Sequence, residues 1–374
     1  MRLGRIQVPG AAEAEERAWA VVRTAYEERE RLPARRSRRR LLLALAAGLS
    51  VAAATLSPPG LAVLGSVRHA LAPGAAARPR AELSSLPAPG RLLVDAPSGA
   101  WVVEADGSKR RLGPYRDPTW SPHGLYVAAV RGHDLLALDP RGTVRWTVTR
   151  PQAVRLPSWN GPDGYRIAYL AGTELRVVNG DGTRDRLLAA GVAPVRPAWL
   201  PGPDHAVAYV AGDGAVRLAA ADTGTRRWSR PSPERPTQLA WSSDGMRLVV
   251  LSPHLLRVLD LAGRQLLRER PPAGSRAVAA AFRPRTRALA ELRQDGAQTT
   301  VSLVHDGRVL FNGPGAIDRL AWSPDGHWLL VGWPTADQWL FLRPSGGRAT
   351  AVANVSDAFG SNSFPALAGW CCGG

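Results

Sequence analysis

Arginine is the residue type whose spacing in this sequence suggests a binding chemistry. In six places an arginine precedes an aromatic residue by three to six positions, and these places recur about every 40 residues. Guanidinium groups bind carboxylate and phosphate oxygens through paired hydrogen bonds, so converging arginines would form a site for an anionic ligand. The alternative is that they are solvated loop arginines. The six candidates are Arg116, Arg155, Arg196, Arg235, Arg276 and Arg319.

Residue types with catalytic or metal-binding chemistry do not fall into known patterns. The sequence has no G-x-S-x-G, H-E-x-x-H, G-x-x-x-x-G-K-[ST] or C-x-x-C motif, and its seven histidines are isolated from one another. The segment 179–182, Asn-Gly-Asp-Gly, lacks the other ligands of a calcium loop and is typical of a hairpin turn. We therefore expect no metal site and no cofactor. An active site assembled from distant loops stays an alternative, because motifs do not detect it.

The only two cysteines, Cys371 and Cys372, are adjacent. Adjacent cysteines can close an eight-membered disulfide ring, but in a terminal segment free thiols or a bond to another chain are more common. Pairing between chains is compatible with the oxidising side of a membrane. We base no function on these residues.

The aromatic residues that follow the arginines mark an internal repeat. Its clearest copy is the segment 321–326, Ala-Trp-Ser-Pro-Asp-Gly, and successive aromatic residues lie 39, 40, 42, 41 and 40 residues apart. A repeat of this length forms one supersecondary unit, which is stable only against its neighbours. The aromatic residues are Trp120, Trp159, Trp199, Trp241, Phe282 and Trp322, followed by Trp370 after a step of 48 residues.

Each repeat contains four short β-rich runs. One run ends at Trp322, and the next three cover residues 328–332, 338–342 and 348–352. Asp-Gly pairs between the runs supply the positive φ angles that tight hairpins need. The pattern predicts a four-stranded antiparallel unit, and such units arranged around an axis form a β-propeller.

The two ends of the repeat array complement each other. Before Trp120 there are only three runs, 91–95, 100–104 and 109–112, and the run with an aromatic residue is missing. After the sixth full repeat, residues 366–370 form such a run with no further runs behind it. We therefore predict that the C-terminal strand completes the first blade of an all-β, seven-bladed propeller formed by residues 91–374.

The repeat resembles the WSPDG-type repeat of TolB-like β-propellers, a relative of the WD-type families. The resemblance covers about residues 91–370, and segment 322–326 matches the motif in full. It implies a propeller fold; propellers of this kind serve as periplasmic or extracellular binding scaffolds and as accessory domains of hydrolases. The Gly-His and Trp-Asp dipeptides of the true WD repeat do not occur at matching positions, which favours the TolB-like branch.

The first 90 residues have a different character from the repeats. Residues 11–32 contain no Gly or Pro, carry three glutamates early and two arginines late, and are expected to form a helix within a cytoplasmic segment, 1–40. Residues 41–57 are uncharged, follow the arginine cluster 35–40, and are predicted to be a single transmembrane helix with the N-terminus in the cytoplasm. Residues 58–90 would then be a juxtamembrane segment and a tether rich in Ala, Pro and Gly.

The apolar segment 41–57 also has other interpretations. Residues 37–42, Ser-Arg-Arg-Arg-Leu-Leu, resemble a twin-arginine export signal, and Ala52-x-Ala54 could be its cleavage site. We favour an uncleaved signal anchor, because a structured cytoplasmic segment would have no use on a discarded peptide. The third interpretation is a buried helix of a soluble domain.

The net charge of +17 comes from 47 arginines and one lysine, Lys109. The basic residues are spread over strands and turns and form one cluster only, so we expect no nucleic-acid partner.

The leading functional hypothesis is a non-catalytic, membrane-anchored, extracytoplasmic binding scaffold for a cell-envelope polymer or a protein partner. If the six arginines form the binding site, this ligand is anionic. Two alternatives are kept. One is a transmembrane signalling protein with the propeller as its sensor and residues 11–32 as its contact to a cytoplasmic regulator, and the other is an enzyme built from propeller loops.

Overall fold

The computed structural model describes residues 83–161, 165–347 and 349–372, and every structural statement below concerns these residues. The predicted helix over 11–32, the predicted span 41–57 and most of the predicted tether lie outside them. No helix of the described residues is long and apolar enough to cross a membrane.

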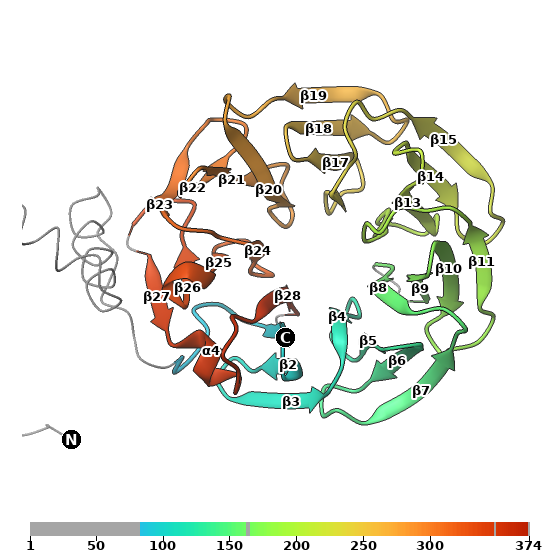
Figure 1. Ribbon diagram of the computed structural model, residues 1–374, viewed down its shortest axis with the longest axis horizontal. Helices are drawn as coiled ribbons and strands as arrows, with labels where there is room; N and C mark the ends of the chain where they lie inside the picture. The colour runs from blue at the N-terminus through green and yellow to red at the C-terminus, as the bar shows by residue number, and fades with distance from the viewer. Residues whose placement is uncertain (1–82, 162–164, 348, 373–374) are drawn as a thin grey trace, which may run out of the picture. The chain divides into compact units, whose positions relative to one another are not determined.

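Seven four-stranded antiparallel sheets are arranged around a central axis (Figure 1). Blade 1 contains β28 (Ala366–Cys371), β1 (Arg91–Ala96), β2 (Gly99–Val103) and β3 (Lys109–Gly113); blade 2 contains β4 (Arg116–Trp120), β5 (Val127–Arg131), β6 (Asp134–Leu138) and β7 (Val144–Thr149); blade 3 contains β8 (Val154–Trp159), β9 (Arg166–Ala171), β10 (Glu174–Asn179) and β11 (Arg186–Ala189). Blade 4 contains β12 (Ala198–Trp199), β13 (Ala206–Val210), β14 (Val216–Ala220) and β15 (Arg226–Arg230); blade 5 contains β16 (Gln238–Trp241), β17 (Arg247–Ser252), β18 (Leu255–Asp260) and β19 (Gln265–Glu269). Blade 6 contains β20 (Ser275–Phe282), β21 (Leu289–Asp295), β22 (Gln298–Leu303) and β23 (Val309–Pro314); blade 7 contains β24 (Arg319–Trp322), β25 (Leu329–Trp333), β26 (Gln338–Leu342) and β27 (Thr350–Ala353).

The C-terminal strand closes the ring, as the sequence predicts. β28 pairs antiparallel with β1, with Trp370 opposite Leu92 and Ala366 opposite Asp95. The first strand of the propeller and the last one therefore share a sheet, and this arrangement removes a free inner edge from blade 1.

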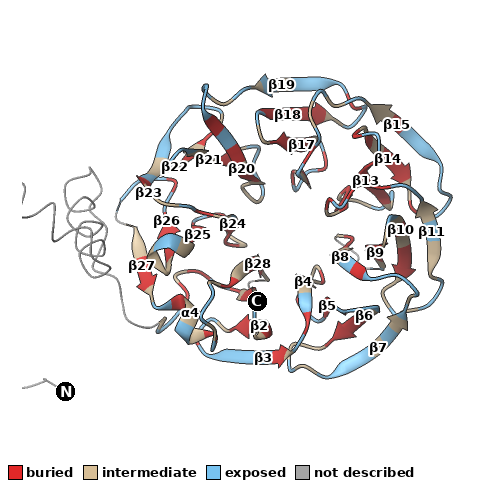
Figure 2. Cartoon of the chain, in the orientation of Figure 1, coloured by how far each residue is buried: buried red, intermediate tan, exposed pale blue. Residues whose placement is uncertain are grey.

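The apolar pattern of each strand follows its position in the blade. All five residues of β13 are buried, because a second-row strand is covered on both faces by the adjacent blades. None of the residues of β7, an outermost strand, is buried: four are exposed and two are intermediate. Figure 2 shows the same gradient around the ring, with buried inner rows and mostly exposed outer strands.

The recurring Ser-x-Asp-Gly segment is a turn that joins the first two strands of a blade. In blade 7 the backbone N–H of Trp328 donates to the Ser323 hydroxyl at 3.0 Å, and the N–H of His327 donates to the Asp325 carboxylate at 3.0 Å. Gly326 supplies the turn's positive φ of 71°. Ser323 is fully buried, so its hydroxyl needs these partners. The conspicuous motif thus encodes the fold.

The long step before Trp370 contains an insertion that packs under blade 1. It holds α4 (Val355–Ala358), and a one-turn 3₁₀ helix, η1 (Pro334–Ala336), interrupts blade 7 before β26. Phe359, just after α4, is buried with its ring 5.6 Å from Trp101 and 5.4 Å from Trp339. The insertion therefore adds core between the last blade and the first.

Candidate anion-binding site at the channel mouth

The six predicted arginines lie where the inner strands of their blades begin. The inner strand is the first strand of its sheet in blades 2 to 7 and is β28 in blade 1, and all inner strands run in one direction along the channel. We call the end at which they start the channel mouth. The arginines occupy strand starts or the residues just before them. Arg116 and Arg319 begin β4 and β24, Arg155 and Arg276 are second in β8 and β20, and Arg196 and Arg235 precede β12 and β16.

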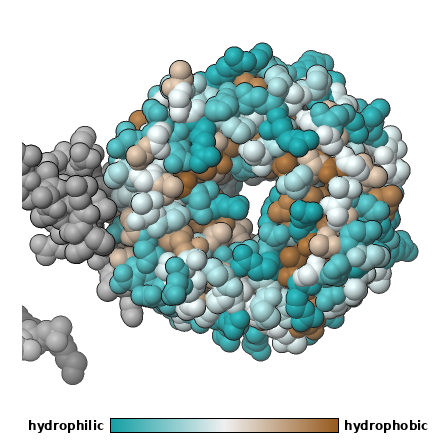
Figure 3. Space-filling model, in the orientation of Figure 1, coloured by the Kyte–Doolittle hydropathy of each residue, from teal (hydrophilic) through white to brown (hydrophobic). Residues whose placement is uncertain are grey.

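Two of these arginines, Arg196 and Arg319, interact electrostatically although they belong to different blades. Arg196 belongs to blade 4 and Arg319 to blade 7, yet the charge of Arg319 helps to lower the pKa of Arg196. Burial is the main cause of that lowering, and the carboxylates of Asp117 and Asp95 oppose it. The Arg196 side chain keeps 37% of its surface exposed although protein surrounds it, as expected for a side chain that lines an open channel. Figure 3 shows the opening at the centre of the ring.

Two carboxylates, those of Asp95 and Asp117, also lie at the channel mouth. Arg116 forms an ion pair with Asp95 at 3.0 Å and donates to the carbonyl of Ala96 at 2.5 Å. Asp95 also accepts the backbone N–H of Asp117 at 2.8 Å, and the Asp117 carboxylate accepts the backbone N–H of Leu156 at 3.0 Å. These contacts connect blade 1 to blade 2 and blade 2 to blade 3.

Other predicted arginines also have structural roles. Arg196 donates to the carbonyl of Pro157 in blade 3 and lies 3.8 Å from the Asp117 carboxylate. Arg235 donates to the carbonyl of Gly212 in blade 4 at 3.0 Å. Arg276 donates to the Gln294 side chain of its own blade at 2.7 Å. These three and Arg116 position backbone and side chains, which the sequence could not show.

Arg155 and Arg319 differ from the other four predicted arginines in their contacts. Both are exposed, and neither forms a side-chain hydrogen bond or an ion pair with any residue in the described part of the chain. A guanidinium group with no protein partner keeps its full capacity for bidentate hydrogen bonds. The site formed by the six arginines stays a prediction, and within it Arg155 and Arg319 have the most donors free.

Asp318, next to Arg319, has a strongly shifted acidity. Burial raises its pKa from 3.8 to about 6, and the charge of Arg319 only partly opposes this shift. Its Oδ1 atom is buried without a hydrogen-bond donor among the described residues. Burial also raises the pKa of Asp95, against the hydrogen bond from Asp117 and the charge of Arg116. The channel mouth thus carries both arginines and carboxylates, and its net charge changes with pH near neutrality.

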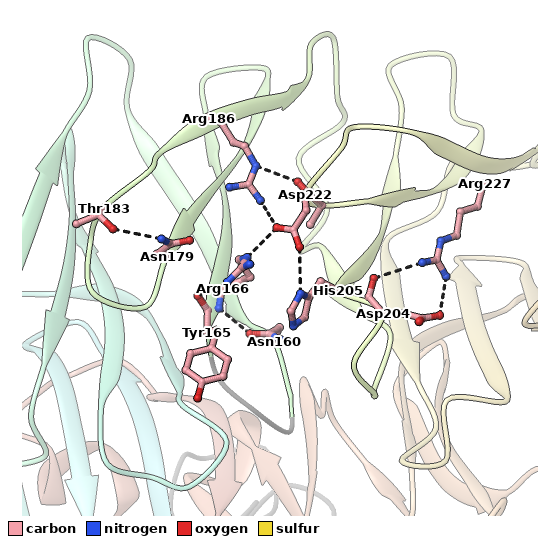
Figure 4. A network of polar contacts seen from close by, with 11 residues as sticks. Asn160, Tyr165, Arg166, Asn179, Thr183, Arg186, Asp204, His205, Asp222 and Arg227 are labelled. Carbon is pink, nitrogen blue, oxygen red and sulfur yellow. Dashed lines mark hydrogen bonds and ion pairs between the residues drawn. The ribbon is translucent and has the colours of Figure 1, made fainter.

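A second polar cluster joins blades 3 and 4 at the other end of the strands (Figure 4). Asp222 accepts from Arg166 at 2.9 Å, from Arg186 at 2.6 Å and from His205 at 3.1 Å. Although burial opposes the shift, the hydrogen bonds from Arg166 and His205 hold the pKa of Asp222 below its usual value. A carboxylate saturated by three donors from two blades is an inter-blade clamp, and we assign it no chemistry.

The two cysteines are bonded to each other. Cys371 and Cys372 form a disulfide with each other, where the sequence favoured free thiols or a bond to another chain. Cys372 Sγ lies 3.3 Å from the carbonyl oxygen of Pro122 in blade 2.

Within residues 83–161, 165–347 and 349–372, no three His, Cys, Asp or Glu side chains are grouped so as to hold a metal ion.

Comparison with solved structures finds β-propellers of similar fold. The C-terminal WD40 domain of Sif2 superposes with a TM-score of 0.53 at 15% identity, over 71% of this chain and 82% of that domain. The β-propeller domain of Cps50 (Swd1) from Myceliophteria thermophila gives 0.52 at 13% identity, over 63% of this chain and 86% of that domain. No family model and no curated protein matches the sequence. At these identities the likeness is one of fold, and the chain is a seven-bladed β-propeller with WD40-like structural neighbours.

Proposed function

We propose that this protein is a non-catalytic binding scaffold of the TolB-like kind that takes an acidic segment of a protein partner at its channel mouth. The guanidinium groups of Arg155 and Arg319 carry this proposal, because they are exposed and form no side-chain hydrogen bond or ion pair with described residues. Arg196 lies at the same end of the channel. Propellers of the WD40 type commonly serve as interaction scaffolds, which supports a protein as the partner. A cell-envelope polyanion is the alternative occupant.

The polar groups at the mouth support binding over catalysis. Asp95 and Asp117 each accept a backbone N–H of another blade, and Arg116 and Arg196 each donate to a backbone carbonyl. Side chains fixed in this way hold the ring together, and we assign Asp318, whose pKa is raised to about 6, a role in the pH dependence of binding.

Replacing Arg155 and Arg319 together with Gln is expected to weaken anion binding tenfold or more. Each removed guanidinium takes away charge-assisted hydrogen bonds worth about 1.5–3 kcal/mol. The measurement is fluorescence anisotropy of a labelled twelve-residue aspartate peptide at low salt and at 300 mM NaCl, because exposed charges are screened over about 10 Å at 0.1 M salt. Arg116 and Arg196 are left in place, since their replacement would also loosen the contacts between blades.

The matched control is the Arg226→Gln and Arg264→Gln variant. Both arginines are exposed, and neither forms a side-chain hydrogen bond or ion pair within the described ranges. Equal loss of binding in the two double variants would contradict a site at the mouth and indicate a generally basic surface. Binding of polyphosphate but of no acidic peptide would favour the envelope polymer.

Asp318 makes the same binding depend on pH. A carboxyl with a pKa of about 6 is mostly ionised at pH 7.5 and mostly neutral at pH 5.5, so its repulsion of the aspartate peptide fades as pH falls. The affinity for the aspartate peptide should therefore rise as the pH is lowered from 7.5 to 5.5. In Asp318→Asn the affinity at pH 7.5 should already be high and the pH dependence flattened.

For location, we propose that the propeller lies outside the cytoplasm and is held by a signal anchor at residues 41–57. The arginine cluster 35–40 followed by an uncharged run supports this orientation. A reporter that works only outside the cytoplasm, fused after Gly90, should be active, and the protein should stay with membranes and keep an N-terminal tag. Recovery of a soluble, untagged protein would establish the cleaved twin-arginine signal instead.

A further inference from the structure

A large hollow lies between blades 2 and 3, at the end of the strands opposite the channel mouth. It has a volume of about 700 Å³ and is lined by the loop after β4, by Trp159 and Tyr165 near the facing ends of β8 and β9, by the start of β7 and by the turn after β10. We call it the aromatic groove, because its walls include Tyr126, Trp146, Trp159 and Tyr165. A space of this size is typical of sites that bury a ligand or a side chain cluster.

The aromatic groove holds an unusual share of exposed apolar surface. Leu125 is 63% exposed, Tyr126 41% and Tyr165 64%. The other tyrosines in the described part of the chain, Tyr115, Tyr169 and Tyr209, are buried. Single exposed apolar residues are ordinary, but several in one hollow mark an interaction site. Tyrosine is also among the residues that contribute most to binding energy at interfaces.

The floor of the aromatic groove is already in its final shape. The Trp146 indole N–H of blade 2 donates to the carbonyl of Gly180 in blade 3 at 2.9 Å. The turn after β10 packs so closely on this ring that a Cβ on Gly182 would lie 2.8 Å from it. A partner would therefore lose little free energy to reorganisation of the groove.

A smaller, charged hollow adjoins the aromatic groove. It lies between blades 1 and 2, has a volume of about 340 Å³, and shares Arg145 with the aromatic groove. We call it the basic groove. Four arginines face two carboxylates there, which leaves two positive charges in excess. The charged residues are Arg91, Arg110, Arg141 and Arg145 with Glu104 and Asp139.

Two guanidinium groups of the basic groove are open to a ligand. Arg145 is neutralised by Asp139 at 2.8 Å, and Arg91 donates to the carbonyl of Gly124 at 2.6 Å. Arg110 and Arg141 are exposed, and their side chains form no hydrogen bond or ion pair with described residues. An apolar hollow joined to a hollow with free positive charge is complementary to a ligand that carries both apolar and acidic groups.

We propose that the two grooves together form a docking site for an extended segment of a partner protein. A large apolar or aromatic side chain of the segment fills the aromatic groove, and a nearby carboxylate binds Arg110 and Arg141. The concave shape favours an inserted side chain over a flat lipid surface. This site is separate from the channel mouth, because its loops lie at the other end of the strands.

The experiment selects peptides on the immobilised full-length protein from a random twelve-residue display library. Twelve extended residues reach about 40 Å, enough to cover both grooves. Enriched sequences should combine an aromatic or large apolar residue with an Asp or Glu. An enriched peptide should lose about 10- to 30-fold in affinity to the Tyr126→Ser and Tyr165→Ser variant, and several-fold to Arg110→Gln and Arg141→Gln.

The matched controls replace the same kinds of side chain, apolar and arginine, at positions outside the two grooves. Leu187→Ser with Leu266→Ser removes two apolar side chains that are 51% and 55% exposed on outer strands, and Arg226→Gln with Arg264→Gln removes two exposed arginines. Both controls, and the Arg155 and Arg319 variant, should bind the peptide normally. Enrichment of no peptide, of peptides without this pattern, or of peptides indifferent to the groove variants would overturn the proposal. Vesicles of anionic lipid that bind through Tyr126 and Tyr165 more tightly than any selected peptide would overturn it as well.

Discussion

Deletion of residues 364–374 is expected to lower the melting temperature by on the order of 10 °C or more, or to leave the protein insoluble. The deletion removes β28, the inner strand of blade 1, and with it the buried Leu367 and Trp370. Burial of one tryptophan contributes several kcal/mol, and a loss of about 1 kcal/mol shifts the melting of a large domain by about 2–4 °C. Differential scanning calorimetry of the propeller measures the effect.

The exposed edge adds to this loss. Leu92, Leu93 and Val94 of β1 are fully buried and pair with β28, so the deletion would present an apolar strand edge to solvent. Removal of residues 373–374 alone is the control and should leave the melting temperature unchanged. A propeller that lacks residues 364–374 yet melts like the control would show that the ring does not depend on its C-terminal strand.

The blade count and the closure could be predicted from the sequence because both depend on local and repetitive signals. Aromatic residues about 40 apart, turn residues between apolar runs, and complementary ends define the ring before any contact is known. The structure also gives these signals a physical role. The indole N–H of Trp322 donates to the backbone carbonyl of Ala281 at 3.0 Å, and that of Trp199 donates to the backbone carbonyl of Ser158 at 2.8 Å. The repeated tryptophan thus joins each of these blades to the one before it.

The roles of the arginines could not be predicted in the same way. Their offsets from the aromatic residue vary, and bulges interrupt the register of β4 between Arg116 and Thr119 and of β8 between Arg155 and Ser158. Asp117 and Leu156 at these bulges have positive φ angles of 50° and 53°. A bulge re-aims the side chains around it, so equal distance from the tryptophan does not give equal direction. Partners such as Asp95, from a neighbouring blade, are also invisible in a single repeat.

The grooves were missed for a related reason. The aromatic groove combines a loop after Trp120 with a turn after Asn179, and no repeat contains both parts. Tyr126 and Tyr165 carried the one available signal, since each is an aromatic residue in the polar loop between the first two strands of its blade. Blade 7 has Trp328 at the position of Tyr126, so comparison of this loop among the repeats would not have singled out the two tyrosines.

Replacement of Arg293 with Ala is expected to destabilise the propeller by about 3–5 kcal/mol at pH 8, the range seen when one partner of a buried ion pair is removed. Glu291 of β21 is fully buried, and its carboxylate lies 2.6 Å from the Arg293 guanidinium. Neither oxygen of the Glu291 carboxylate has a well-oriented hydrogen-bond donor among the described residues. The ion pair with Arg293 is therefore the main interaction that offsets the cost of burying the Glu291 charge. Arg293 also reaches Glu269 of blade 5 at 3.2 Å. Urea unfolding at several pH values measures the effect.

The cost should depend on pH with a definite sign. Burial raises the pKa of Glu291 above its usual 4.5, Arg293 opposes the shift, and Glu269 adds to it. A raised pKa in the folded state means that the carboxyl favours folding below its unfolded pKa and that this contribution is lost as pH rises through the folded pKa. Without Arg293 the folded pKa moves higher still. The difference between the variant and the parent should therefore be small near pH 5 and grow towards pH 8.

A second substitution separates the buried charge from the lost packing of the Arg293 side chain. Glu291→Gln in the Arg293→Ala background should restore most of the stability at pH 8 and remove the pH dependence, because no uncompensated charge is left in the core. Arg287→Ala is the surface control. Arg287 pairs with Asp244 at 3.3 Å with both side chains well exposed, so its replacement should cost less than about 1 kcal/mol. Equal costs for Arg293→Ala and Arg287→Ala, or no recovery with Glu291→Gln, would show that Glu291 does not carry a buried charge.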